Sequence, residues 1–141
     1  SIEVQTEIDM ATIDSIKIPR FILQPLLENS CEHGMLRDQS LHIRIHIHYD
    51  SKKFVIYVMD NGVGFAAESM ARLNKIFAAP SSSNVVEGRE ENGKGIGLVN
   101  VNKRLKMRYG EEYGLTILDS AEHNSCIEVN IGRNVTIQQK V

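Results

Sequence analysis

The stretch that decides the predicted fold is NGKGIGLVNVNKRLKMRYG, Asn92–Gly110, in which a glycine-rich segment leads directly into an amphipathic helix. Its glycines stand at alternate positions, Gly93, Gly95 and Gly97. Glycine at every second position costs backbone entropy, so we expect it where another group approaches the backbone closely or the dihedral angles are unusual. Beyond the glycines the apolar residues recur at helical spacing, and Gly110 is a suitable end for the helix.

A phosphate-binding P-loop is the first explanation to test, because Gly88 to Lys94 fits the pattern G-x-x-x-x-G-K. Gly95 stands where a P-loop has Ser or Thr, and a polar segment rather than a strand leads into the motif. Glu90 and Glu91 would also repel a phosphate, so we reject the P-loop. A helix N-terminus still offers free backbone N–H groups to an anion. A flexible linker before an ordinary helix start remains the alternative for this stretch alone.

Length and composition predict one domain over residues 1–141. A hydrophobic fraction of 42% suits a packed core, and a net charge of −2 offers no whole-chain attraction to nucleic acid or an anionic membrane. No apolar run approaches the roughly 20 residues of a membrane-spanning helix, and the first residues do not resemble a signal peptide. Cys31 and Cys126 are too few for a disulfide framework or a zinc site, so a reducing, cytoplasmic location is expected.

Periodicity predicts strands and helices in an order that defines the fold class. Strands are expected at residues 2–8, 41–48, 54–60, 115–119 and 126–131, and helices at 18–34, 66–78 and 97–109. Residues 12–17 are expected to form a connection, 80–95 a long polar loop, and 133–141 a tail without a packing face. This order predicts an α/β two-layer sandwich with its helices on one face of the sheet, not the strict strand–helix alternation of a Rossmann fold.

The same periodicities predict which side chains are buried. Aliphatic residues alternate with polar ones in residues 41–48, so His42, His46 and His48 share an outward face. We favour a solvated face there over a metal site, because no cysteine or carboxylate lies near in sequence. Residues 54–60 are almost continuously apolar, which predicts a central strand. Further residues expected to face the core are Leu23, Leu26, Leu27, Ser30, Met70, Leu73, Ile76, Phe77, Leu98, Val101, Leu105, Ile127, Val129 and Ile131.

DNGVGF, Asp60–Phe65, follows the central strand and places a carboxylate at its end. That carboxylate can accept a hydrogen bond from an exocyclic amine such as adenine N6, while Gly62 and Gly64 let a ligand approach. Guanine presents an acceptor at the same edge, and two facing acceptors would leave a buried group unpaired. The alternative is a tight turn, for which Asp-Asn-Gly is well suited.

IPRFILQPLLENSCEHG, Ile18–Gly34, carries a polar helix face beside its apolar one. Asn29 offers a neutral oxygen to a hard cation such as Mg²⁺. His33 lies one turn further along on the same side of the helix. The alternative is a solvated helix face, which we favour for Glu32.

Together and in this order, these segments resemble the ATP-binding boxes of the GHKL superfamily, whose domain is the Bergerat fold. Ile18–Gly34 is similar to the N box of sensor histidine kinases of the LytS/YesM type, Asp60–Phe65 to their first glycine box and Asn92–Gly110 to their second. The resemblance covers residues 2–132. It implies a mixed, mostly antiparallel sheet and the catalytic, ATP-binding domain of a protein histidine kinase.

The resemblance also implies ligands and roles for individual residues. ATP and Mg²⁺ are the implied ligands, with Asn29 on Mg²⁺, Asp60 on adenine, and residues 80–95 as a lid over the nucleotide. Glu28 and Asn29 are the implied catalytic residues, and Glu28 would polarise the histidine that accepts the phosphoryl group. The residues implied in ATP binding are Asn29, His33, Asp60, Gly62, Gly64, Gly93, Gly95, Gly97, Leu98 and Ser125.

Two positions depart from the family pattern. Glu32 stands where the N box commonly has Lys, which removes a phosphate contact. Asn124 and Ser125 replace a usual Gly-Thr pair near the adenine. We expect both changes to weaken ATP binding without abolishing it.

The implied partners are the dimerisation and phospho-acceptor helices of the same kinase and, indirectly, a response regulator. None of the five histidines lies in a helix of the phospho-acceptor kind, so transfer needs another part of the kinase. The implied location is the cytoplasmic side of a membrane-anchored bacterial sensor kinase, with no nucleic-acid or membrane contact by this domain itself.

Two alternatives within the superfamily stay open. A GHKL-type ATPase or anti-sigma-like serine kinase would place a Glu base one helical turn before Asn29, where this chain has Pro25. A pseudo-kinase would bind nucleotide only for regulation, and the departures at Glu32 and Ser125 keep that hypothesis open.

Overall fold

The computed structural model describes residues 2–8, 13–34, 40–49, 53–83, 95–119, 125–132 and 136–139. In chain order the elements are β1 (Ile2–Ile8), β2 (Ile13–Lys17), α1 (Arg20–Gly34), β3 (Leu41–Tyr49), β4 (Phe54–Asp60), α2 (Ala67–Ala78), α3 (Ile96–Tyr109), β5 (Gly114–Ile117), β6 (Ser125–Asn130) and β7 (Thr136–Gln139).

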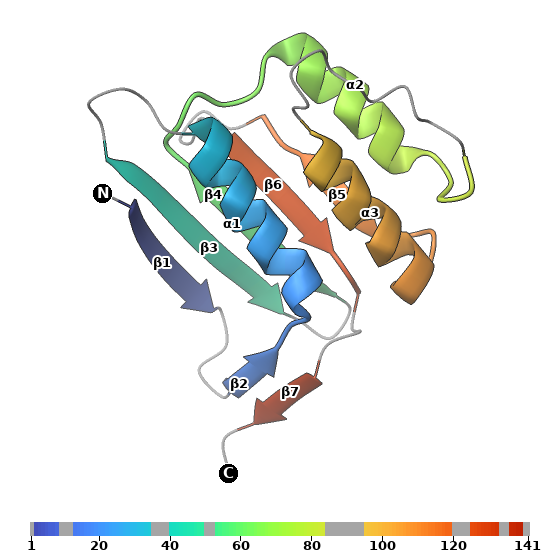
Figure 1. Cartoon of the computed structure of the whole chain (residues 1–141). Helices are drawn as coiled ribbons and strands as arrows, with labels where there is room; N and C mark the ends of the chain where they lie inside the picture. The colour runs from blue at the N-terminus through green and yellow to red at the C-terminus, as the bar shows by residue number, and fades with distance from the viewer. Residues whose placement is uncertain are drawn as a thin grey trace.

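Five of the described strands form one sheet in the order β1-β3-β4-β6-β5. β1 runs parallel to β3, and the other neighbours in this sheet are antiparallel. α1, α2 and α3 cover the same face of the sheet (Figure 1). The predicted two-layer sandwich with a mixed, mostly antiparallel sheet is therefore confirmed.

Two segments differ from the prediction. Residues 12–17 were expected to form a connection, but Ile13–Lys17 is strand β2. The segment from Arg133 onward offered no packing face in the sequence, yet it contains β7, which pairs antiparallel with β2. A short strand of four or five residues paired with a distant partner gives too brief an alternation to be recognised locally.

The core lies between the sheet and the three helices. The alternation of apolar and polar residues in the sequence correctly predicted which side chains of β3 face it. Leu41, Ile43, Ile45 and Ile47 of β3 are each at most 5% exposed. β4 lies between β3 and β6, which explains its almost continuous apolar run. The helices contribute the predicted Leu26, Leu73, Phe77, Leu98, Val101 and Leu105, all buried, whereas Met70 and Ile76 are half-buried.

Asn102 joins three elements inside this core, although its residue type is polar. Its Nδ2 donates to the backbone oxygen of Phe77 at 3.2 Å, and its Oδ1 accepts from the backbone N–H of Leu115 at 2.9 Å. Asn74 of α2 likewise exchanges two hydrogen bonds with the backbone of Ile117 on the edge strand β5. These amides satisfy backbone groups of the edge strand β5, and the Phe77 oxygen in the last turn of α2, that would otherwise be unpaired.

Candidate functional site

α1 and α3 pack side by side in opposite directions, and this packing decides which motifs meet. The guanidinium of Arg108, near the end of α3, lies 5.6 Å from the ring centre of Phe21, near the start of α1. The second half of α1 therefore lies at the same end of the molecule as the beginning of α3 (Figure 1). The N box and the second glycine box are brought together by this antiparallel arrangement.

Asp60 is the last residue of β4 and lies at the same end of the molecule as the second half of α1. The residue is 4% exposed, and both of its carboxylate oxygens accept hydrogen bonds. Oδ2 accepts from the hydroxyl of Ser30 on α1 at 2.8 Å, and Oδ1 accepts from the backbone N–H of Gly62 at 2.9 Å. Across the sheet, Asp60 pairs with Ser125 of β6, which is also buried. Asp60 thus stands next to the helix residue that follows Asn29.

The loop after Asp60 is held in place by Asn61. Its side-chain oxygen accepts from the backbone N–H of His42 at 2.8 Å, and its amide donates to the backbone oxygen of Ser40 at 3.1 Å. Gly62 is buried, and Gly64 has a φ of 77°, which favours glycine. The sequence prediction assigned the two glycines but missed the side chain between Asp60 and Gly62 that fixes the loop.

The predicted residues on α1 are divided between two sides of the helix. Asn29 is half-buried and directly precedes Ser30, so it belongs to the end of α1 that contacts Asp60. Glu28 is exposed, accepts a hydrogen bond from Gln24 at 3.1 Å, and points about 100° away from Asn29 around the helix. His33 belongs to α1, but its side chain lies outside the described part of the structure.

The geometry at the start of α3 requires a glycine at one of the three alternating positions, Gly95. Gly95 has a φ of 92°, and a β-carbon on it would lie 2.9 Å from Cδ2 of Leu73. Gly97 is exposed, and no described atom would lie within 4 Å of its β-carbon. Leu98 is 1% exposed, counting backbone and side chain together, and its side chain belongs to the hydrophobic core. Gly93 lies outside the described residues, as does most of the predicted lid.

Comparison with known proteins places the chain in a family. A model of the histidine kinase-, DNA gyrase B-, and HSP90-like ATPases matches residues 14–138. The chain belongs to this ATPase family. The resemblance predicted from the N box and the two glycine boxes is therefore confirmed.

Relatives of this ATPase-family chain include several sensor proteins named LytS. That of Oceanobacillus iheyensis is 38% identical over 103 residues, which cover 72% of this chain and 16% of that protein. That of Bacillus subtilis is 29% identical over 138 residues, which cover 97% of this chain and 21% of that protein. The chain thus spans only about a fifth of the length of these relatives.

Solved structures show the same fold at low sequence identity. The catalytic domain of the histidine kinase ThkA, in a nucleotide-free form, superimposes with a TM-score of 0.58 at 16% identity, covering 92% of this chain and 78% of that one. A mycobacterial sensor histidine kinase, MprB, gives a TM-score of 0.58 at 12% identity, covering 93% of this chain and 83% of that one. The Bergerat fold predicted from the sequence is confirmed by these neighbours.

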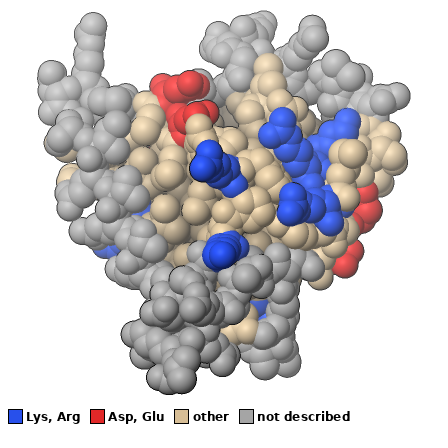
Figure 2. Space-filling model, turned by 60° about the horizontal axis from the view of Figure 1, so that its bottom comes forward, with Lys and Arg blue, Asp and Glu red and all other residues tan. Residues whose placement is uncertain are grey.

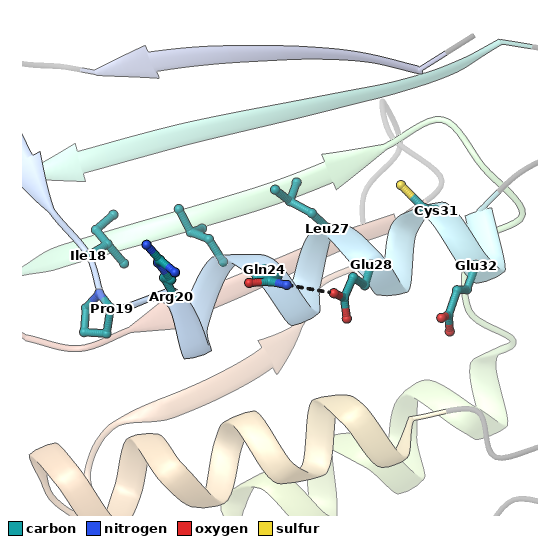
Figure 3. Close-up of a pocket in the computed structure, with 9 residues that line it drawn as sticks. Ile18, Pro19, Arg20, Gln24, Leu27, Glu28, Cys31 and Glu32 are labelled. Carbon is teal, nitrogen blue, oxygen red and sulfur yellow. Dashed lines mark hydrogen bonds between the residues drawn. The ribbon is translucent and has the colours of Figure 1, made fainter.

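A groove among the described side chains lies elsewhere on α1. It encloses about 560 Å³ and is lined mainly by apolar atoms (Figure 3). Leu23, Leu27 and Cys31 line it together with Gln24 and Glu28, which lie side by side along the helix. Neither Asn29 nor Asp60 lines this groove, so we place the candidate site at the buried carboxylate of Asp60 instead.

Another face of the molecule carries several charged side chains (Figure 2). Figure 2 shows Lys and Arg side chains in separate groups among uncharged residues, on a face that includes the lower end of the view in Figure 1. A second groove, of about 410 Å³, is lined by Phe21, Arg104, Met107 and Arg108. Because Arg108 contacts the first turn of α1, this groove lies at the opposite end of the helix pair from Asp60.

The chain entering the predicted lid is attached to the end of α3 by Glu111. Its carboxylate accepts from the backbone N–H of Ser81 at 3.0 Å and also from the Ser81 hydroxyl. Lys106 donates to the backbone oxygen of Glu111 at 2.6 Å. The Ser81 side-chain and backbone hydrogen bonds lower the pKa of Glu111 from its ordinary value of 4.5, with a smaller contribution from the charge of Lys106. Ser81, in the first residues of the predicted lid, is therefore held by an ionised carboxylate.

None of the helices in the described part of the chain is both long and apolar enough to cross a membrane.

Proposed function

We propose that this chain is the ATP-binding catalytic domain of a two-component sensor histidine kinase. It would hold ATP for transfer of the terminal phosphoryl group to a histidine on a separate dimerisation domain. The observation that carries the proposal is the buried Asp60 carboxylate, fixed by Ser30 and Gly62 at the end where the family's three boxes meet. The LytS relatives and the histidine kinase neighbours support this choice within the ATPase family.

Asp60 is the proposed adenine-binding residue. A carboxylate accepts hydrogen bonds and cannot donate them, so it selects an exocyclic amine over a carbonyl oxygen at the same position. Gly62 and Gly64 would leave room beside it for the purine, and Ser125 would lie across the strand pair from it. Adenine nucleotides are the expected ligands, and guanine nucleotides are expected to be excluded.

The polyphosphate would lie between α1 and the start of α3. Gly95, Gly97 and Leu98 would offer backbone N–H groups there, because the first N–H groups of a helix have no partner within it. Gly93 would offer its N–H from the segment that leads into the helix. His33 would lie on the same side of α1 as Asn29. Residues 80–95 are the proposed lid, with Ser81 at its fixed beginning.

Mg²⁺ fits the described residues if the nucleotide supplies most of its ligands. Asn29 offers an amide oxygen, and the described residues contain no cluster of three His, Cys, Asp or Glu side chains that would hold a metal ion alone. Mg²⁺ is commonly bound by one or two protein oxygens together with phosphates and water. When bound, it would neutralise charge that develops on the transferred phosphoryl group.

The acceptor histidine would come from the dimerisation helices of the same kinase, and a response regulator would receive the phosphoryl group afterwards. Glu28 is the proposed residue that polarises this histidine, since its carboxylate is exposed on α1. We further propose that the domain is cytoplasmic and belongs to a membrane-anchored kinase.

Calorimetry with ATP, ADP and GTP, each with and without Mg²⁺, tests the proposal. We expect binding of the adenine nucleotides and no measurable binding of GTP. The isolated chain should also fail to hydrolyse ATP steadily, because Pro25 stands one turn before Asn29 and cannot act as a general base. Steady hydrolysis would favour the ATPase alternative instead.

A further inference from the structure

Ser30 is a buried hydroxyl on the apolar face of α1. It is 2% exposed and lies one turn after Leu26, which is fully buried. A hydroxyl in such a position is costly unless it forms a hydrogen bond. Its partner is Oδ2 of Asp60, 2.8 Å away and 30 residues further along the chain. A polar residue within an apolar helical stripe therefore has one specific contact, and that contact is the proposed adenine-binding carboxylate.

The two hydrogen bonds to Asp60 come from different elements and reach different oxygens. Ser30 holds Oδ2 from the helix layer, while the Gly62 N–H holds Oδ1 from the loop that follows β4. Rotation of the carboxylate about its Cβ–Cγ bond would break both. Each oxygen has further acceptor capacity for a ligand, because an ionised carboxylate accepts about four hydrogen bonds.

We infer that Ser30 is a positioning residue that sets adenine selectivity by fixing the plane of the Asp60 carboxylate. This inference rests on the proposed function, because it concerns the same nucleotide site. Alanine at position 30 would leave the Gly62 N–H as the sole described donor to Asp60. The carboxylate could then turn away from the exocyclic amine, while groups that meet the ribose and phosphates would be unaffected.

The test compares ATP with purine riboside triphosphate, in which hydrogen replaces the exocyclic amine. We expect Ser30→Ala to weaken ATP binding about three- to tenfold, which is the range for one hydrogen bond. Binding of the purine analogue should stay within about twofold of its wild-type value, so selectivity for the amine falls. Ser30→Thr keeps the hydroxyl and should restore selectivity, and Thr116→Ala, which removes an exposed hydroxyl on β5, should change neither affinity.

Equal weakening of both ligands would show that Ser30 is only structural and would overturn the inference, as would unchanged ATP binding in Ser30→Ala. Thermal unfolding of each variant identifies a general loss of folding. Should Ser30→Thr fail to fold, the double variant Ser30→Ala/Asp60→Asn decides, since the serine change should then add no further loss of selectivity. If the unmodified chain binds no ATP, both the proposed function and the inference on Ser30 fail. If the unmodified chain binds ATP and Ser30→Ala binds it equally well, the inference on Ser30 fails and the proposed function is retained.

Discussion

Gly95 at the start of α3 packs against Leu73 of α2 so closely that a β-carbon would lie 2.9 Å from Leu73 Cδ2. Its φ of 92° is also a conformation that residues with a side chain rarely adopt. The positive φ, together with the contact between α2 and α3, therefore favours glycine here whether or not a phosphate approaches it. Gly97, two residues later, has neither constraint among the described residues, so its need for glycine has to come from something else.

Gly95→Ala should destabilise the fold. The strained backbone and the contact with Leu73 together should lower the free energy of unfolding by about 1–3 kcal/mol. Gly97→Ala is the matched control, and its stability should be unchanged or slightly higher because alanine favours the helix. Urea unfolding of both variants measures the difference. Equal stability of the two would mean that the contact between α2 and α3 relaxes without cost.

The fold was predictable from sequence where long periodic segments carried it. β3 alternates over nine residues and β4 is almost continuously apolar up to Asp60, so both strands and their buried faces were correctly predicted. β2 and β7 were missed, because their pairing joins residues near opposite ends of the chain. Contacts of that kind depend on the tertiary structure and leave little local signal.

The site was predictable as three motifs but not as a set of contacts. Asp60 was expected to meet a ligand, whereas its bonds to Ser30 and Gly62 become visible only when β4 and α1 are in place. One signal was available, since Ser30 is a polar residue in an otherwise apolar helical stripe. The roles of Asn61 and Asn102 had no such signal, because an asparagine in a turn or on a helix does not reveal which distant backbone groups it will contact.

Asp60→Asn should weaken adenine-nucleotide binding about tenfold to 150-fold, which corresponds to the loss of a hydrogen bond to a charged group. Asp119→Asn is the matched control, because Asp119 is exposed after β5 and should not change affinity. Calorimetry with ADP measures both variants without turnover. Unchanged ADP affinity in Asp60→Asn would remove the adenine assignment while leaving the fold assignment intact.

Asn102→Ala should destabilise the domain by about 2–3 kcal/mol, because it leaves the Phe77 oxygen and the Leu115 N–H without their partner inside the core. Asn100→Ala on the same helix is the control. Asn100 is exposed, so its replacement should be neutral or slightly stabilising. Thermal unfolding distinguishes the two, and a small effect at Asn102 would show that water or a shift of β5 replaces the lost bonds.

The two cysteines should differ in reactivity. Burial, and to a lesser degree the charge of Glu128, raises the pKa of Cys126, and its side chain is 5% exposed. Cys31 is half-buried in the wall of the groove along α1. Because the thiolate is the reactive form, we expect iodoacetamide at neutral pH to modify Cys31 at least about tenfold faster than Cys126. Peptide mass spectrometry measures both rates, and Cys126 should become reactive only on unfolding.

The contact between Glu111 and Ser81 should be lost in acid. Hydrogen bonds from Ser81 lower the pKa of Glu111 below 4.5, so the folded state favours the ionised carboxylate. The stabilising contact is therefore fully present above pH 4.5 and disappears as the pH falls through the lower, folded-state pKa. We expect the amide resonance of Ser81 in an NMR titration to shift with an apparent pKa below 4.5. In Glu111→Gln the shift should vanish, while in Glu112→Gln, a change of the exposed neighbour, it should persist. A Ser81 titration that survives Glu111→Gln would mean that another group anchors the beginning of the lid segment.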